Sequence, residues 1–232
     1  MKACSFKMKS IITISLFIII GSSFISCAQN KSDNKVEKKT KVDLNKYSKA
    51  VFASGCFWCV EGVFESITGV EEVISGYAGG KEIDPNYEQV GSGQTGHAEA
   101  IEVYYDSTKV NYNTLLRVYF SSQDVTQVNG QGPDRGSQYR SIIFYSNDKE
   151  NQSAVKYIEE INKSKNYDEP VAATVDKLTK FYPAEDYHQD YILHNPKNPY
   201  VNGESIPRIK RAQSQLKDLL KPEKILKYTF FI

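Results

Sequence analysis

Residues 49–77 read KAVFASGCFWCVEGVFESITGVEEVISGY and contain the first elements of the predicted fold. Residues 49–53 form a short apolar run of strand type, and residues 56–67 repeat apolar side chains at helical spacing between two glycines. Residues 70–77 then alternate apolar and polar side chains, as a half-buried strand does. The stretch therefore predicts a strand, a helix and a second strand in direct succession.

The rest of the chain completes an α+β pattern. Further strands are predicted at residues 98–105, 139–145 and 171–178, and further helices at residues 112–122 and 148–163. The order strand, helix, strand, strand, helix, strand is that of the split βαβ plait, a ferredoxin-like two-layer sandwich. We therefore expect a mixed sheet, followed by an extended C-terminal tail that is charged and helical in pattern over residues 205–227.

The composition fits a single globular domain and argues against nucleic-acid binding. The 232 residues are 40% hydrophobic and 25% charged, with a formal net charge of +1. The first 26 residues hold three lysines and no acid, so the rest of the chain has fewer basic than acidic residues. A nucleic-acid-binding protein needs a basic surface, which this balance does not indicate.

Residues 1–26 have the organisation of a secretory signal. A basic segment precedes the apolar run IITISLFIII at residues 11–20, and small residues follow before Cys27. The run is too short to favour a membrane-spanning helix. The position of Cys27 resembles a bacterial lipoprotein site, where we expect cleavage of the signal and lipidation of Cys27. Ordinary cleavage nearby and an uncleaved anchor are the alternatives.

A polar, lysine-rich segment separates this signal from the domain. Residues 27–48 lack regular apolar spacing and bury too little surface to offset their chain entropy, which predicts a flexible tether. One folded domain with its tail then occupies residues 49–232. With the signal, this organisation predicts an exported, lipid-anchored protein of the bacterial cell envelope that faces the periplasm or the outside. We expect a monomer.

Two cysteines stand at the start of the predicted helix, in the sequence Gly55-Cys56-Phe57-Trp58-Cys59. Cysteines three residues apart share a helix face and lie within reach of a disulfide. A helix N-terminus also favours the thiolate of Cys56 through its dipole and free N–H groups. A redox pair and a structural disulfide are both open interpretations. Zinc is weaker, because there is one cysteine pair and the histidines lack finger spacing, and we predict no bound metal.

Six motifs, in order, resemble the A-type peptide methionine sulfoxide reductases. They are GCFW at 55–58, GYAGG at 76–80, PNYE at 85–88, TGHAEA at 95–100, GSQYRS at 136–141 and FYPAEDYHQDY at 181–191. Together they are far more specific than a Cys-x-x-Cys pair. The resemblance implies that residues 49–232 form a catalytic domain that reduces the S epimer of methionine sulfoxide, free or in proteins.

The resemblance also implies roles for individual residues. A sulfoxide sulfur reacts with a thiolate only when its oxygen is protonated or strongly hydrogen-bonded, so the site needs a nucleophile and an acid. Cys56 matches the nucleophile, and Glu99 matches an acid that burial would keep protonated near neutral pH. The remaining roles are hydroxyls that hold the sulfoxide oxygen (Tyr87, Tyr139), walls around the S-methyl group (Phe57, Trp58) and a polar group that seats the substrate (Asp134). We expect His97 and His188 to be structural.

The chain departs from many relatives at Cys59, where glycine is common, and no cysteine follows it. We therefore predict that Cys59 condenses with a sulfenic acid on Cys56 to form a disulfide, which a thioredoxin-like donor reduces. No bound cofactor is predicted. A second departure, Gln-Asp-Val-Thr at residues 123–126 in place of His-Asp-Pro-Thr, predicts altered loop rigidity.

Two other functions use some of the same features. A general thiol-disulfide oxidoreductase would use the cysteine pair but give no role to Glu99. A non-enzymatic lipoprotein would bind methionine-rich or oxidised partners without turnover. Replacement of Glu99 by glutamine separates the three functions, because it removes the acid and leaves the thiols in place.

Overall fold

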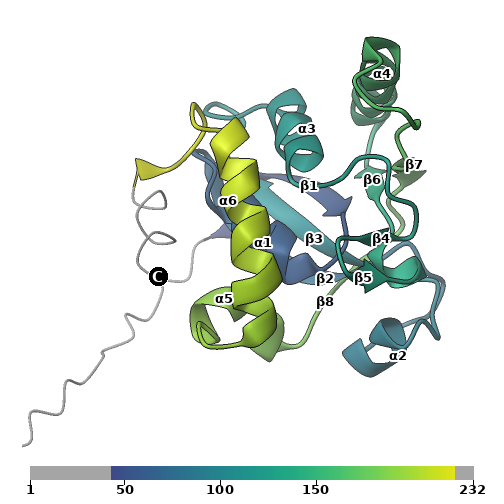
Figure 1. The fold of residues 1–232 in the computed structure, drawn as a ribbon, viewed down its shortest axis with the longest axis vertical. Helices are drawn as coiled ribbons and strands as arrows, with labels where there is room; N and C mark the ends of the chain where they lie inside the picture. Colours follow the sequence, from purple (N-terminus) through teal and green to yellow (C-terminus); the bar gives the residue numbers. More distant parts are fainter. Residues whose placement is uncertain (1–42, 223–232) are drawn as a thin grey trace, which may run out of the picture. The chain divides into compact units, whose positions relative to one another are not determined.

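The computed structural model describes residues 43–222. The predicted signal, the lipidation site at Cys27 and most of the predicted tether lie outside the described residues. A short 3-10 turn, Leu44–Lys46, leads directly into strand β1, Ser48–Ala53, so the last residues assigned to the tether belong to the folded unit (Figure 1). No helix between residues 43 and 222 is long and apolar enough to cross a membrane.

A six-stranded mixed sheet forms the centre of this unit. Its strand order is β7-β6-β1-β3-β2-β8, in which β6 and β7 are parallel and the other neighbours are antiparallel. The strands beyond β1 are β2 (Val70–Ala78), β3 (Ala98–Tyr105), β6 (Ile142–Tyr145), β7 (Thr174–Lys177) and β8 (Phe181–Pro183). A separate ribbon pairs β4 (Gly130–Gln131) with β5 (Asp134–Arg135). The predicted α+β class and mixed sheet are confirmed.

Helices connect the strands and cover the sheet. Helix α1, Phe57–Glu65, joins β1 to β2, and α3, Tyr112–Ser121, lies between β3 and β6. Helix α4, Asp148–Ser164, joins β6 to β7. Two short helices are α2, Tyr87–Gly91, and α5, Tyr191–His194. A π-helical turn, Val201–Ser205, leads into α6, Ile206–Gln215. Helix α6 crosses in front of α1 and packs on it, so residues 205–215 of the predicted tail are part of the domain (Figure 1).

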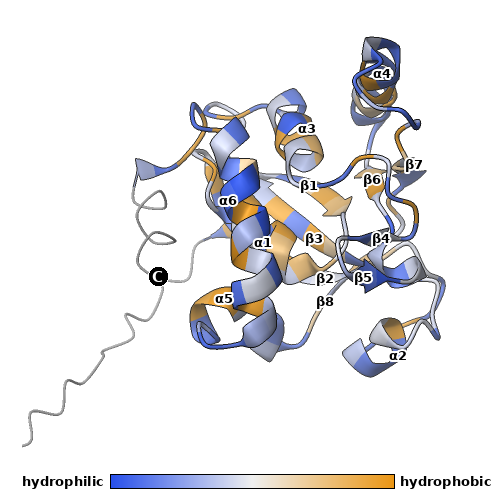
Figure 2. Cartoon of the chain, viewed as in Figure 1, coloured by the Kyte–Doolittle hydropathy of each residue, from blue (hydrophilic) through white to orange (hydrophobic). Residues whose placement is uncertain are grey.

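The main core lies between the helices and one face of the sheet. Hydrophobic residues, coloured orange, are frequent on the central strands and on α1 (Figure 2). Successive residues of a strand point to opposite faces, so Ile101 and Val103 of β3 lie in this core while Ala98 and Ala100 pack on the other face. By the same alternation Glu99 points to the helix-covered face, where it is 1% exposed. The strand therefore delivers a carboxyl group into the interior, next to the start of α1.

Two predicted strands are shorter in the structure, and one strand of the main sheet was not predicted. The strand predicted at residues 139–145 begins at Ile142, because Gly136 adopts a φ of 134° and starts a 3-10 turn at Ser137–Tyr139. The strand predicted at residues 171–178 is shorter, at Thr174–Lys177. Strand β8 was not predicted, since three residues are too few to show an alternating pattern.

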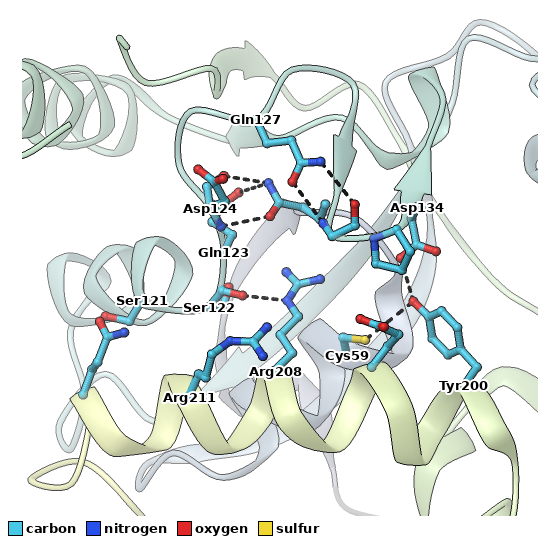
Figure 3. Close-up of a pocket in the computed structure, with 15 residues that line it drawn as sticks. Cys59, Ser121, Ser122, Gln123, Asp124, Gln127, Asp134, Tyr200, Arg208 and Arg211 are labelled. Carbon is cyan, nitrogen blue, oxygen red and sulfur yellow. Dashed lines mark hydrogen bonds between the residues drawn. The ribbon is translucent and has the colours of Figure 1, made fainter. Parts of the chain in front are cut away.

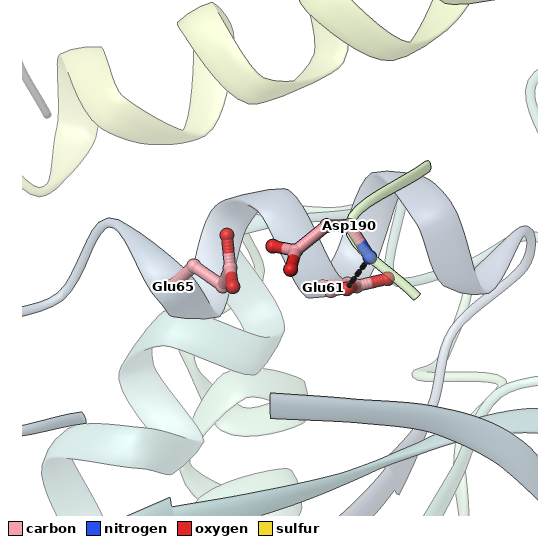
Figure 4. A group of neighbouring side chains, drawn as sticks. All are labelled: Glu61, Glu65 and Asp190. Carbon is pink, nitrogen blue, oxygen red and sulfur yellow. Dashed lines mark hydrogen bonds between the residues drawn. The ribbon is translucent and has the colours of Figure 1, made fainter. Parts of the chain in front are cut away.

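A cluster of three carboxylates lies between α1 and the turn before α5. The oxygens of Glu61, Glu65 and Asp190 lie within 4.8 Å of one another, a group of a kind that can hold a cation (Figure 4). Glu61 accepts hydrogen bonds from Ser75 Oγ at 2.7 Å and from the backbone N–H of Asp190 at 2.7 Å. Burial raises the pKa of Glu61 to about 8. These bonds engage both Glu61 oxygens, and we interpret the cluster as part of the scaffold.

Candidate active site

Two buried free thiols stand at the N-terminus of α1. Cys56 is the N-cap residue and is 5% exposed, and Cys59 lies in the first turn and is 1% exposed. Gly55 before them has a φ of +67°, and a Cβ there would meet Gln131 Cβ at 2.6 Å. Glycine is therefore required at position 55 both by the backbone turn and by the packing of Gln131.

The two thiols have opposite pKa shifts. Burial, together with the neighbouring Cys59, raises the pKa of Cys56 well above its usual range. The hydrogen bond from Cys56, with the charge of Arg208 and a hydrogen bond to Ser205, lowers the pKa of Cys59 to about 6. The direction of the Cys56 shift does not support the prediction that the helix start favours the Cys56 thiolate in the reduced pair. Cys56 makes no side-chain capping bond to the helix, and Cys59 has the polar neighbours.

The side chain of Glu99 contacts the backbone of Phe57, the residue directly after Cys56. Its Oε2 accepts a hydrogen bond from the backbone N–H of Phe57 at 3.0 Å. Burial raises the pKa of Glu99 to about 8, and the bond from Phe57 opposes this shift only in part. The carboxyl group can therefore carry a proton at neutral pH beside the thiol pair.

Tyr87 and Tyr139 come from two separate helical segments, and both lie near Glu99 and Cys56. Tyr87 begins α2, behind the capping residue Asn86. Tyr139 ends the 3-10 turn before β6. Burial raises both phenol pKa values, that of Tyr87 to about 12, and the nearby Glu99 and Cys56 raise them further. Both tyrosines therefore remain neutral hydrogen-bond donors at neutral pH.

Asp134 lies on the Cys59 side of the site. Its Oδ2 accepts a hydrogen bond from Tyr200 OH at 2.6 Å, and burial raises its pKa. Tyr200 OH is also 4.0 Å from Cys59 Sγ. These three residues line a cavity of about 330 Å³ that Arg208 also lines, whereas Cys56 is not among its lining residues (Figure 3).

Aromatic rings surround the start of α1. Trp58 stacks on Tyr191 with ring centroids 3.7 Å apart, and its Nε1 donates to His188 Nδ1 at 3.1 Å. Phe57 is 1% exposed and packs on Tyr87 and His188. The role of Phe57 in lining the methyl site stays a prediction. Trp58 is partly exposed.

Comparison with known proteins assigns the chain to a family. Residues 48–220 match the family Peptide methionine sulfoxide reductase. The chain belongs to this family. It is 50% identical over 161 residues to peptide methionine sulfoxide reductase MsrA 2 of Mesorhizobium japonicum, which covers 69% of this chain and 83% of the relative. It is 43% identical over 216 residues to MsrA 2 of Synechocystis sp., which covers 90% of this chain and 99% of the relative.

A solved structure supports the same assignment. Reduced Mxr1 from Saccharomyces cerevisiae matches with a TM-score of 0.61 and 31% identity, over 69% of this chain and 92% of that chain. The chain is thus an enzyme of the peptide methionine sulfoxide reductase family that reduces methionine sulfoxide. The exchange-only and binding-only alternatives are not supported by these comparisons.

Four residues near the reductase site were not predicted to have a role there. His188 holds Trp58, and burial lowers its pKa, so the neutral ring can accept that bond. Glu185 accepts hydrogen bonds from Tyr77 OH at 2.8 Å and from the backbone N–H of Tyr87 at 2.9 Å. Both lie in the FYPAEDYHQDY motif, which was the available signal. Tyr200 and Arg208 lie outside every quoted motif, so the sequence offered no signal for them.

His97 is structural, as predicted. The backbone N–H of Gly80 donates to its Nδ1 at 3.2 Å, and its Nε2 lies 2.9 Å from the carbonyl oxygen of Glu82.

The loop at residues 123–126, where rigidity was expected to change, is held by contacts of Gln123 and Val125. Gln123 accepts a hydrogen bond from Ser141 Oγ at 2.6 Å, and Val125 is buried.

Proposed function

We propose that this reductase acts on the S epimer of methionine sulfoxide, free or in proteins, with Cys56 as nucleophile and Glu99 as acid. The observation that carries the proposal is the buried Glu99 carboxyl, bonded to the N–H of Phe57 directly after Cys56. Its pKa of about 8 leaves the proton in place for transfer at neutral pH. A general exchange enzyme would have no use for this acid.

In the proposed first step Cys56 passes its thiol proton to Cys59, its hydrogen-bonded neighbour of lower pKa, and Cys56 Sγ forms a bond to the sulfoxide sulfur. Glu99 donates its proton to the sulfoxide oxygen, and the hydroxyls of Tyr87 and Tyr139 stabilise that oxygen as its bond to sulfur weakens. The protonated oxygen then moves to Cys56 Sγ as the bond between the two sulfurs and the bond from oxygen to the methionine sulfur break, which releases methionine and leaves a sulfenic acid on Cys56. The methionine sulfur is thereby reduced and Cys56 is oxidised. Restoring methionine in damaged proteins is a repair reaction.

We infer that recycling runs through a disulfide between Cys56 and Cys59. Two free thiols in the first turn of one helix support this step, since neither needs to move far to reach the other. A thioredoxin-like dithiol donor then reduces the disulfide by exchange. Asp134, bonded to Tyr200 beside Cys59, fits a role in seating the polar part of the substrate.

Glu99→Gln tests the acid. Glutamine keeps the bond from the Phe57 N–H but has no proton of comparable acidity to give, so kcat/KM for the S epimer should fall by about 10² to 10⁴. Disulfide exchange with a small dithiol should persist, since the thiols remain. Retention of sulfoxide reduction in a folded Glu99→Gln sample would remove Glu99 from the mechanism.

We propose that Cys27 is lipidated and that the enzyme is held at the cell envelope. The sequence pattern of residues 1–27 supports this placement. Fatty-acid labelling of the expressed chain tests it, with Cys27→Ser as the matched control. Label in the parent chain and none in Cys27→Ser is the expected result, and equal labelling of both would contradict it.

We also infer that the scaffold of the site is the split βαβ plait. The order β6-β1-β3-β2, with neighbours antiparallel, supports it, as does the use of α1 and α3 as the two connecting helices. Strands β7 and β8 then extend the plait by one strand at each edge.

A further inference from the structure

Cys59 contacts the C-terminal segment of the chain as well as Cys56. Its Sγ lies 3.2 Å from Ser205 Oγ, and when Cys59 carries its proton the thiol donates to that hydroxyl. Ser205 ends the π-helical turn that leads into α6. The hydroxyl is fully buried, so water does not compete for the contact. If Cys59 ionises, the same hydroxyl can rotate and donate to the sulfur.

Arg208 supplies a buried positive charge on the same side of Cys59. Its Nε donates to the Ser122 carbonyl oxygen at 2.6 Å, and its Nη2 donates to the carbonyl oxygen of Ser54 at 2.8 Å. These acceptors are neutral, and within residues 43–222 no carboxylate lies within ion-pair distance of the guanidinium. Arg208 is only 9% exposed and lines the same cavity as Cys59 (Figure 3). A buried cation of this kind favours a nearby anion.

We propose that Ser205 and Arg208 hold Cys59, rather than Cys56, as the thiolate of the reduced pair. This inference rests on the proposed recycling through a Cys56–Cys59 disulfide. Ser205 then donates a hydrogen bond to the thiolate, and Arg208 supplies the opposite charge. Both are positioning residues that act through Cys59, because neither contacts the sulfoxide in the proposed reaction.

The assignment gives Cys59 two roles in recycling. Its thiolate attacks the sulfenic sulfur of Cys56, so that an S–S bond forms, the S–O bond breaks, and hydroxide leaves and takes up a proton to become water. In the return step a donor thiolate attacks Cys56 Sγ, and Cys59 leaves as a thiolate. The second donor thiolate then attacks the mixed disulfide and frees Cys56, so the donor is oxidised to its disulfide. A leaving thiol of lower pKa leaves faster, which directs attack to Cys56.

Five other titratable groups bear on the charge of Cys59. They are Cys56 at the start of α1, Glu99 on β3, Asp134 on β5, Glu204 in the π-helical turn and Tyr200 just before it. Ionised carboxylates near Cys59 disfavour its thiolate. Glu99 has a pKa of about 8, so it keeps its proton at neutral pH and adds no negative charge there.

The test is the pH dependence of alkylation in the reduced full chain, without sulfoxide. Iodoacetamide reacts with thiolates, and fragmentation of the tryptic peptide 50–81 separates Cys56 from Cys59. The midpoint for Cys59 should lie below pH 7, and Cys59 should be modified before Cys56 at neutral pH. Ser205→Ala and Arg208→Met should each raise the Cys59 midpoint by about one pH unit.

Two matched controls come from the same helix. Arg211→Met removes an exposed charge at the rim of the same cavity, and Ser214→Ala removes a hydroxyl that bonds only backbone in α6; both should leave the midpoint unchanged. If Arg208→Met does not fold, the proposal is judged on the Cys59 midpoints of Ser205→Ala and of the wild-type chain. A wild-type Cys59 midpoint near the ordinary thiol value of about 8.5, or no shift in Ser205→Ala, would overturn the proposal. Because no sulfoxide is present, this outcome is independent of whether the proposed reaction occurs.

Discussion

Glu99 illustrates how one residue acquires its chemistry from burial. An acid in an alternating strand is usually solvent-facing, yet the register of β3 turns this side chain into the core beside Cys56. The family motif indicated the role of Glu99, and burial explains why its pKa is near 8. The sequence could not show the opposite shifts of Cys56 and Cys59, because burial, the contact between the two thiols, and the neighbours Ser205 and Arg208 of Cys59, more than 140 residues away, depend on the fold.

The first prediction concerns the pH dependence of the chemical step. A general acid works only while it is protonated, so the rate of methionine formation in a single turnover should decline as the pH rises through about 8. In Glu99→Gln the residual rate should lack this decline. Rapid-quench measurements from pH 6 to 9 provide the test, and a wild-type rate that keeps rising above pH 9 would contradict the assignment of Glu99 as the acid.

A second prediction concerns Cys59. Cys59→Ala should release one methionine per enzyme and then stop with a thioredoxin donor, since the sulfenic acid has no resolving thiol. Steady-state turnover with that donor is the measurement. Full turnover by Cys59→Ala would show that the disulfide is not required.

At the scale of elements, the short strand β8 connects the edge of the sheet to the site. Strand β8 pairs with β2. Glu185, just after β8, accepts hydrogen bonds from Tyr77 OH and from the backbone N–H of Tyr87, the first residue of α2. Periodicity predicted the longer helices and strands but not β8 or the 3-10 turn that presents Tyr139. These pieces are shorter than one period of a sequence pattern and are held by tertiary contacts.

Gly76→Ala tests this connection. Any Cβ at Gly76 would collide with the backbone oxygen of Tyr182 and with the Phe181 ring, so β8 must shift away from β2. We expect a loss of stability of about 1 to 3 kcal/mol and a rise in KM as Glu185 releases Tyr87. Gly203→Ala is the control, because nothing lies within 4 Å of its Cβ position. Thermal unfolding and kinetics that match in the two variants would show that β8 does not position the site.

At the scale of the whole molecule, the C-terminal segment completes the active site that the N-terminal half begins. Helix α6 packs on α1 through Ile209, which is fully buried, and carries Arg208 to the cavity beside Cys59. The sequence left open whether this tail packs on the domain. A charged helix with one apolar face fits either case, and only the structure shows which surface it covers.

The contribution of Glu61 and Glu99 to the stability of the domain should fall as the pH rises from 5 to 8. Glu61 and Glu99 have folded pKa values of about 8, above the unfolded value of about 4.3, so the folded state binds more protons in this range. Their contribution is complete below the unfolded pKa and is lost as the pH rises through the folded pKa, on the order of 3 kcal/mol for each carboxyl.

Thermal unfolding of Glu99→Gln measures this effect. The Tm of the variant relative to wild type should be higher at pH 8 than at pH 5, because glutamine does not titrate. The exposed residue Glu88 supplies the control, and Glu88→Gln should show no such difference between the two pH values. An equal Tm difference at both pH values for Glu99→Gln would contradict the raised pKa.

The most direct test of the account is one turnover of the reduced enzyme with separated S and R epimers of a blocked methionine sulfoxide, with thiols counted in the tryptic peptide 50–81. The account predicts one methionine from the S epimer alone and the loss of both thiols, Cys56 and Cys59, to one disulfide. Methionine from the R epimer, or methionine from the S epimer with Cys59 still a free thiol, would contradict it.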